Sequence, residues 1–116
     1  MIAVIFELEP QSDEKETYFN IAESLRPLLN EIDGFISIER FQSLREPSCY
    51  LSLSFWRDEA SVKEWRNKEG HRMAQKRGRT EIFVDYRLRI ASVQRDYSMT
   101  NREQAPLDSK ELHDQR

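Results

Sequence analysis

The sequence predicts an α+β fold of the ferredoxin-like type, with the element order β-α-β-β-α-β and a four-stranded antiparallel sheet. Four segments alternate in residue character with a period of two, which is typical of strands. Two segments between them repeat apolar residues every three to four positions, which is typical of amphipathic helices. The turn between the second and third strands is short, so those strands form a hairpin. Right-handed crossovers then place both helices on one face of the sheet.

The first half of the pattern comprises a strand and a long helix. Residues 2–9 alternate in residue character and form the strand. A helix of about 18 residues follows an N-cap at Ser12 or Asp13, and Pro27 lies inside it. Gly34 ends this helix, because glycine readily adopts the left-handed conformation of a C-cap.

The second half of the pattern holds the hairpin, a broken helix and a long last strand. Strands are predicted at residues 35–44 and 49–56. Asp58 caps the second helix, and Gly70 interrupts it. The last strand is expected to run over residues 80–97.

The hydrophobic pattern covers most of the chain but not its end. Residues 1–97 are predicted to form one domain, which suits a chain of 116 residues. Residues 98–116 are polar and nearly devoid of large apolar side chains. We expect this tail to be disordered or to lie against a partner.

Composition excludes several classes of function. A net charge of -3 gives no electrostatic reason to expect nucleic acid or an anionic membrane as a partner. Cys49 is the single cysteine, so the chain forms no internal disulfide. No apolar run approaches the ~20 residues that cross a bilayer, and the N-terminus lacks the basic start of a signal peptide. We therefore expect a cytoplasmic protein.

Large apolar side chains occupy both faces of the predicted strands. Phe35 and Phe41 alternate with Ile36 and Ile38, although helices are expected to cover one face only. The simplest way to cover the second face is another copy of the chain packed sheet against sheet. The sequence therefore predicts a homodimer.

Four stretches of this sequence resemble the antibiotic biosynthesis monooxygenase (ABM) family of small dimeric α+β barrel proteins. They are GFIS at residues 34–37, WRNKEGHRMAQ at 65–75, GR at 78–79 and FVDYRLR at 83–89. The resemblance extends over about residues 1–96. It implies a dimeric α+β barrel, and it implies one of three functions, because the family holds cofactor-independent oxygenases of aromatic phenols or quinols, heme-degrading enzymes, and proteins without an established reaction.

The resemblance favours a cofactor-independent monooxygenase that acts on a small aromatic or phenolic substrate, with no cofactor expected. One alternative is a non-catalytic dimeric module that binds a small molecule or serves in a stress response, since fold does not imply function. The second alternative is a heme-binding or heme-degrading protein. Heme-degrading relatives use an Asn in the first strand, a Trp in the second helix and a His ten residues after it. Trp65 matches that Trp, but Gln75 stands in place of the His and the first strand has no Asn.

Three residues are candidates for catalysis. His71 could accept a proton from a phenolic substrate or could be a structural histidine. Six residues separate it from Trp65, about 240° around an ideal helix, so the two side chains share a site only if the helix breaks between them. Trp65 could line an aromatic pocket or anchor the core. Arg87 could stabilise an anion in that pocket or form an ion pair, for example with Glu39.

Further residues are candidates for binding a substrate. Tyr50, Ser52 and Trp56 lie on one face of the third strand as a mixed polar and aromatic strip, with Phe83 on the last strand. The same strip could instead form the interface between subunits. Two histidines and one cysteine without ligand spacing predict no metal site.

Overall fold

The computed structural model describes residues 1–77 and 81–114. Its elements follow the order β-α-β-β-α-β, with the second helix split in two and a further helix in the tail. The elements are β1 Ile2–Pro10, α1 Lys15–Asn30, β2 Phe35–Gln42, β3 Tyr50–Trp56, α2 Glu59–Arg66, α3 Glu69–Arg77, β4 Phe83–Ser92 and α4 Leu107–His113. The predicted α+β class is confirmed.

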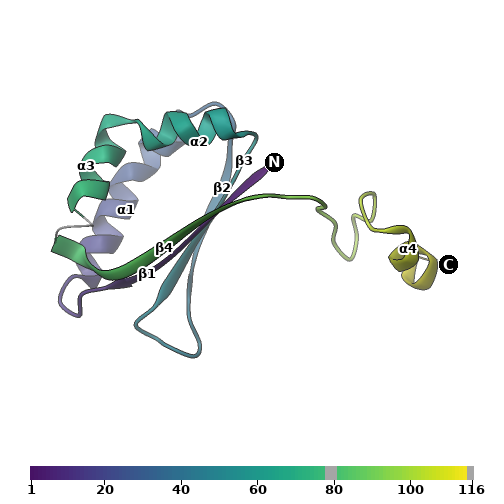
Figure 1. Cartoon of the computed structure of the whole chain (residues 1–116), viewed down its shortest axis with the longest axis horizontal. Helices are drawn as coiled ribbons and strands as arrows, with labels where there is room; N and C mark the ends of the chain where they lie inside the picture. The colour runs from purple at the N-terminus through teal and green to yellow at the C-terminus, as the bar shows by residue number, and fades with distance from the viewer. Residues whose placement is uncertain (78–80, 115–116) are drawn as a thin grey trace.

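The four strands form one antiparallel sheet in the order β2-β3-β1-β4. Helices α1, α2 and α3 all lie over one face of this sheet, and the other face carries no helix (Figure 1). The register fixes which side chains share a face. Phe6 lies opposite Ser52 on one side and Leu88 on the other, so these three side chains point the same way, toward the helices.

The core between sheet and helices consists of two separate clusters. The first contains Trp56, which is 1% exposed, and joins the end of α1 to α2. The second contains Ile82, which is 2% exposed, and joins the start of α1 to β1 and β3. The middle of the sheet lies between the clusters, and this division is what leaves room for a site.

The second helix breaks before the position that the sequence indicated. It ends at Arg66, where the Asn67 side-chain amide donates a hydrogen bond to the Lys63 carbonyl oxygen at 3.0 Å. Gly70 lies inside α3 instead. A Cβ at that position would come within 2.8 Å of Leu28 Cδ1, so Gly70 lets α3 pack closely against α1.

The structure confirms the predicted N-cap of α2 but not that of α1. Asp58 caps α2 as expected, because its carboxylate accepts hydrogen bonds from the Ser61 amide and hydroxyl. The N-cap of α1 is Glu14, without a side-chain bond, so the prediction of Ser12 or Asp13 was wrong. Gly34 has φ +98°, the predicted left-handed conformation, but it does not cap α1, which ends at Asn30 with Glu31 as its C-cap.

Both strands of the hairpin, β2 and β3, and the last strand β4 are shorter than predicted. The turn of the hairpin begins at Ser43, whose amide donates to Cys49 O at 3.0 Å, so β2 stops at Gln42. Strand β4 ends at Ser92, which lies opposite Ile2 at the start of β1. The predicted start of the last strand at Thr80 lies outside the described residues.

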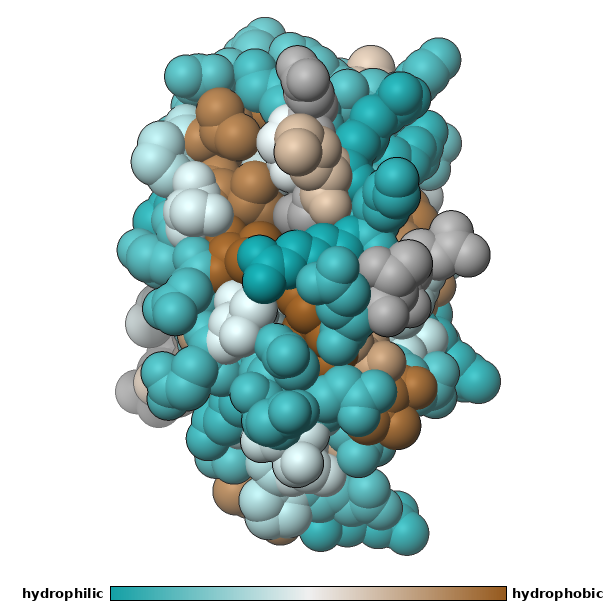
Figure 2. Space-filling model, turned by 90° about the vertical axis from the view of Figure 1, so that its left-hand side faces the viewer, coloured by the Kyte–Doolittle hydropathy of each residue, from teal (hydrophilic) through white to brown (hydrophobic). Residues whose placement is uncertain are grey.

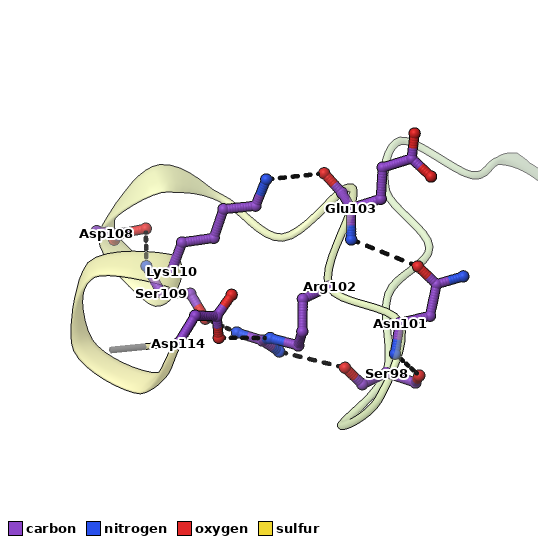
Figure 3. Close-up of polar contacts among 8 residues, drawn as sticks. All are labelled: Ser98, Asn101, Arg102, Glu103, Asp108, Ser109, Lys110 and Asp114. Carbon is purple, nitrogen blue, oxygen red and sulfur yellow. Dashed lines mark hydrogen bonds and ion pairs between the residues drawn. The ribbon is translucent and has the colours of Figure 1, made fainter. Parts of the chain in front are cut away.

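The tail contains a short helix, which differs from the expectation of disorder. It runs away from the sheet, and α4 lies at its far end (Figure 1). Arg102 holds α4 in place by donating to Asp114 Oδ1 at 2.9 Å and to Ser109 Oγ at 2.7 Å (Figure 3). Leu107 and Leu112 remain exposed, so polar bonds maintain this helix, and the sequence carried no periodic apolar signal for it.

Replacing Gly34 by alanine is expected to destabilise the domain by about 2 kcal/mol or more. The new Cβ would meet Ser61 Oγ at 2.0 Å while the backbone stays at a positive φ, and the bond to Asp58 holds that hydroxyl in place. Gly70→Ala is the matched control. Its clash is with the mobile end of Leu28, and alanine favours a helix, so its effect should stay within about 1 kcal/mol. Urea unfolding would measure both, and equal losses would contradict this account.

Candidate functional site

A cavity of about 390 Å³ lies between the helix-covered face of the sheet and the helices. Side chains from all four strands and from α1, α2 and α3 line it, and most of them are apolar. Figure 2 shows apolar side chains running down the middle of one face of the molecule, with hydrophilic side chains on both sides. A mainly apolar hollow with a few polar groups is typical of a small-molecule site.

Small side chains on β3 form the floor of this cavity and leave empty space above the sheet. Ser52 and Ser54 are both buried and both line it, where larger apolar residues would fill the space. Ser54 Oγ accepts a hydrogen bond from Trp56 Nε1 at 2.9 Å, which fixes the indole at one end of the floor. Two adjacent serines on this face of β3, followed by Trp56, therefore leave a hollow with an aromatic wall at one end.

His71 and Trp65 come together on the helix side of the cavity. Their rings stack with centroids 4.4 Å apart and an angle of 16° between the planes, and both residues line the cavity. The break between α2 and α3 makes this contact possible, because it falls between the two residues. The sequence predicted that His71 and Trp65 could share a site only if the helix breaks between them. The helix does break there, although at Asn67 and not at Gly70.

The hydrogen bonding of His71 determines its protonation state. Nδ1 lies 3.1 Å from the Trp65 carbonyl oxygen, which can only accept, so Nδ1 carries the hydrogen. Burial lowers the pKa of His71 below its usual value, and the bond to Trp65 offsets part of this effect. The imidazole is then neutral at pH 7, with a lone pair on Nε2. This is the form that a general base requires.

Three of the four predicted substrate-binding residues line the cavity. They are Ser52, Trp56 and Phe83. Tyr50 is buried beside it instead, with its ring 5.2 Å from Phe19 and Lys15 Nζ 5.8 Å above it. The prediction for Tyr50 is corrected because this tyrosine lies beyond the cavity, in the second core cluster.

The structure does not bring Arg87 to the cavity. Leu88 lines the cavity, and neighbouring side chains on a strand point to opposite faces. Arg87 is exposed and lies opposite Glu7 on the face without helices. It also cannot reach Glu39 of the same chain, because β4 and β2 are the two edges of the sheet. Its assignment as an anion-stabilising residue of this cavity is therefore withdrawn.

The cavity also contains polar residues that the sequence analysis did not select. Arg40 of β2 donates from Nε to the Tyr18 hydroxyl at 3.3 Å, and its guanidinium lies 6.0 Å from the centre of that ring. Burial raises the pKa of Tyr18, so its hydroxyl keeps its proton. Gln75 lines the wall four residues after His71. Helical spacing could have indicated Gln75, but no local pattern pairs Arg40 with a residue 22 positions away.

The described residues, 1–77 and 81–114, contain neither a metal-binding cluster nor a membrane-spanning helix. No three His, Cys, Asp or Glu side chains come close enough there to hold a metal ion. None of the helices in that part of the chain has the length and apolar character needed to cross a membrane.

Comparison with known proteins places the chain in a family. The model of the antibiotic biosynthesis monooxygenase family matches residues 1–77. Jasmonate monooxygenase ABM of Pyricularia oryzae is 53% identical over 93 residues, which are 80% of this chain and 43% of that protein. The uncharacterized protein YqjZ of Bacillus subtilis is 30% identical over 94 residues, 80% of this chain and 79% of that protein. The chain belongs to the antibiotic biosynthesis monooxygenase family.

Solved structures share the fold. A conserved protein from Methanosarcina mazei Go1 aligns with a TM-score of 0.73 at 18% identity, over 80% of this chain and 92% of its own. An antibiotic biosynthesis monooxygenase aligns with a TM-score of 0.69 at 12% identity, over 80% and 98%. At such identities these likenesses establish the ferredoxin-like architecture alone. The chain spans less than half the length of the Pyricularia relative.

The pKa of His71 is expected to lie below the 6.5 of an unperturbed histidine, because its ring is buried against Trp65. The variant His113→Gln leaves His71 as the one histidine, so NMR titration of its ring protons follows a single group. A midpoint below 6.5 is the predicted result. A midpoint at or above 6.5 would show that burial does not control this histidine.

Stability should also depend on pH through His71. Its pKa is lower in the folded protein than in the unfolded chain, so between those two values the unfolded chain binds more protons. The free energy of unfolding should therefore fall as pH drops through 6.5 and level off below the folded pKa. The variant His71→Gln should lose this component. Denaturant titrations at several pH values would test this, and parallel curves for the two proteins would refute it.

Proposed function

We propose that this protein is a cofactor-independent monooxygenase that oxidises a small, mainly apolar substrate in the cavity beside Trp65. One observation carries the proposal. A neutral histidine with a lone pair on Nε2 is fixed in the wall of an apolar cavity by its contacts with Trp65. A base held in this way can activate an acidic substrate for direct reaction with dioxygen.

The reaction balances without an external reductant. His71 Nε2 takes a proton from the activated position of the substrate, and the resulting carbanion transfers an electron to dioxygen. The two radicals combine to form the C–O bond of a peroxide, which takes the proton back from His71. His71 then removes the second C–H proton as the C=O bond forms and the O–O bond breaks, and the departing hydroxide takes that proton and leaves as water. In total a CH₂ group and O₂ give a C=O group and H₂O. Expecting no cofactor is part of this proposal.

The remaining walls serve to hold the substrate and exclude water. Trp65 orients His71 through its carbonyl oxygen and covers one face of its ring. Trp56 and Phe83 offer aromatic surfaces for a flat substrate, and Ser52 lies on the floor between them. Gln75 lies on the same helix as His71 and can donate a hydrogen bond to a substrate oxygen.

The substrate class follows from these walls as a proposal. A small aromatic phenol or quinol has the acidity and the flat apolar skeleton that the cavity favours. The name of the Pyricularia relative, a jasmonate monooxygenase, adds a second candidate, because that protein is 53% identical to 80% of this chain. Jasmonate therefore belongs in the first panel of substrates tested.

Two alternatives remain separate proposals. A non-catalytic module could hold a small molecule in the same cavity, and it would show binding without consumption of dioxygen. Heme binding is the second alternative, but Gln75 stands where heme-degrading relatives have a histidine, and the first strand has no asparagine. Titration with hemin distinguishes this alternative, and we expect no shift of the Soret band.

We further propose that the protein works as a homodimer that buries the face of the sheet without helices. Leu51, Leu53 and Phe55 alternate with the cavity-lining residues of β3 and so point away from the helices. Ile5 lies opposite Leu53 on the same face. An apolar face of this kind on an uncovered sheet is typical of an interface between copies.

Replacing His71 by glutamine should lower kcat by about 10²- to 10⁴-fold, because it removes the base while keeping a polar side chain of similar size. Oxygen uptake with a panel of phenols, quinols and jasmonate would measure the rate. Incorporation of one atom of ¹⁸O per product, read by mass spectrometry, would identify a monooxygenase. His113→Gln is the control and should retain full activity. Unchanged turnover in His71→Gln would remove the mechanism.

Light scattering at micromolar concentration should give twice the chain mass of 13.9 kDa. Leu53→Glu should shift the protein to the monomer, since it puts a charge into the proposed interface. Leu44→Glu adds the same charge in the hairpin turn, where the side chain is fully exposed, and should leave the dimer intact. A monomer mass for the wild type would refute the dimer.

A further inference from the structure

The charged residues in the cavity wall are all of one sign. Arg26, Arg40 and Arg66 line the cavity together with His71, and no carboxylate lines it among the described residues. This contrasts with the net charge of -3 for the whole chain. A mainly apolar hollow whose fixed charges are all positive attracts an apolar molecule that carries a negative charge.

Arg40 is the arginine of the cavity wall that is partly buried and has no ion pair with a described residue, whereas Arg66 is exposed to solvent. Arg26 already pairs with Glu23 at 3.6 Å. Arg40 is half-buried and makes no ion pair with any described residue, and Glu39 points to the opposite face of β2. A partly buried cation without an anion is costly, and a ligand that supplies the anion recovers that cost.

The contact with Tyr18 prepares Arg40 for one kind of ligand. Its Nε is used by the Tyr18 hydroxyl, which fixes the plane of the guanidinium and leaves both terminal nitrogens as donors. Two parallel N–H donors match the two oxygens of a carboxylate. The Tyr18 hydroxyl keeps its proton, because burial raises its pKa, so it remains a donor next to the Nε of Arg40.

We infer that Arg40 and Tyr18 form a carboxylate-binding subsite, so that the cavity takes small amphipathic carboxylates with their apolar part against the aromatic walls. The inference rests on the proposed function in one respect, namely that the cavity is the substrate site. Arg40 recognises and orients the ligand from β2, while His71 acts from α3 on the other wall. Arg40 is a positioning residue for the substrate and takes no part in proton transfer.

A binding experiment without turnover tests this subsite. The probe is 4-phenylbutyrate, and the matched neutral probe is its primary amide, which has the same skeleton. Both Trp56 and Trp65 line the cavity, so quenching of tryptophan fluorescence can report binding, with calorimetry as a second readout. The wild type should bind the carboxylate at least about tenfold more tightly than the amide at low salt.

Variants identify the group responsible. Arg40→Gln should weaken carboxylate binding by about ten- to a hundredfold and change amide binding by less than about threefold. Arg45→Gln is the matched control, because Arg45 is an exposed arginine of the β2–β3 turn and makes no ion pair with the described residues. It removes the same charge and should leave both affinities unchanged. Tyr18→Phe should produce a smaller loss for the carboxylate alone.

Several outcomes would overturn the subsite. They are equal affinity of the wild type for carboxylate and amide, no binding of the carboxylate at millimolar concentration, equal weakening of both probes in Arg40→Gln, or an equal effect of Arg45→Gln. Failure of the monooxygenase proposal is a different result. It would leave the preference of the wild type for the carboxylate intact, with dioxygen uptake absent.

Discussion

The contact between Trp65 and His71 is the interaction on which the rest of the site depends. Trp65 belongs to the core cluster around Trp56, so its position is fixed by burial. Helix α2 ends at Arg66 and α3 begins at Glu69. The His71 ring of α3 stacks on Trp65 of α2, and this contact joins the two helices. Gly70 completes the arrangement by letting α3 approach Leu28 of α1. The same contacts that pack the second crossover therefore also orient the candidate base.

The cavity follows from how the core is divided. Large side chains concentrate in two clusters at the ends of the sheet, and Ser52 and Ser54 occupy the floor between them. Burial of the clusters stabilises the domain, while the middle of the sheet contributes little packing. The charge of the cavity wall also differs from that of the whole chain, because the wall carries arginines while the chain has a net negative charge. The proposed chemistry depends on keeping this middle space open.

Periodicity was sufficient to predict the strands, the helices and their order, because these depend on patterns local in sequence. The family was suggested separately, by the resemblance of four short stretches of the sequence. The cap at Asp58 and the left-handed Gly34 have chemical signatures of the same local kind. The site was predicted less completely. The face toward which Arg87 points follows from strand register, and the pairing of Arg40 with Tyr18 joins β2 to α1. Such contacts form only when the whole sheet is assembled, so no stretch of sequence contains them.

The central claim is that His71, in the wall of the cavity, carries an unprotonated Nε2 at neutral pH, and the nitrogen spectrum of the imidazole tests it most directly. In ¹⁵N-labelled His113→Gln protein at pH 7, two-bond correlations between ring nitrogens and ring protons distinguish the tautomers. The account predicts the form with hydrogen on Nδ1, as the bond to the Trp65 carbonyl oxygen requires. A spectrum of the Nε2–H tautomer, or of the imidazolium, would contradict it.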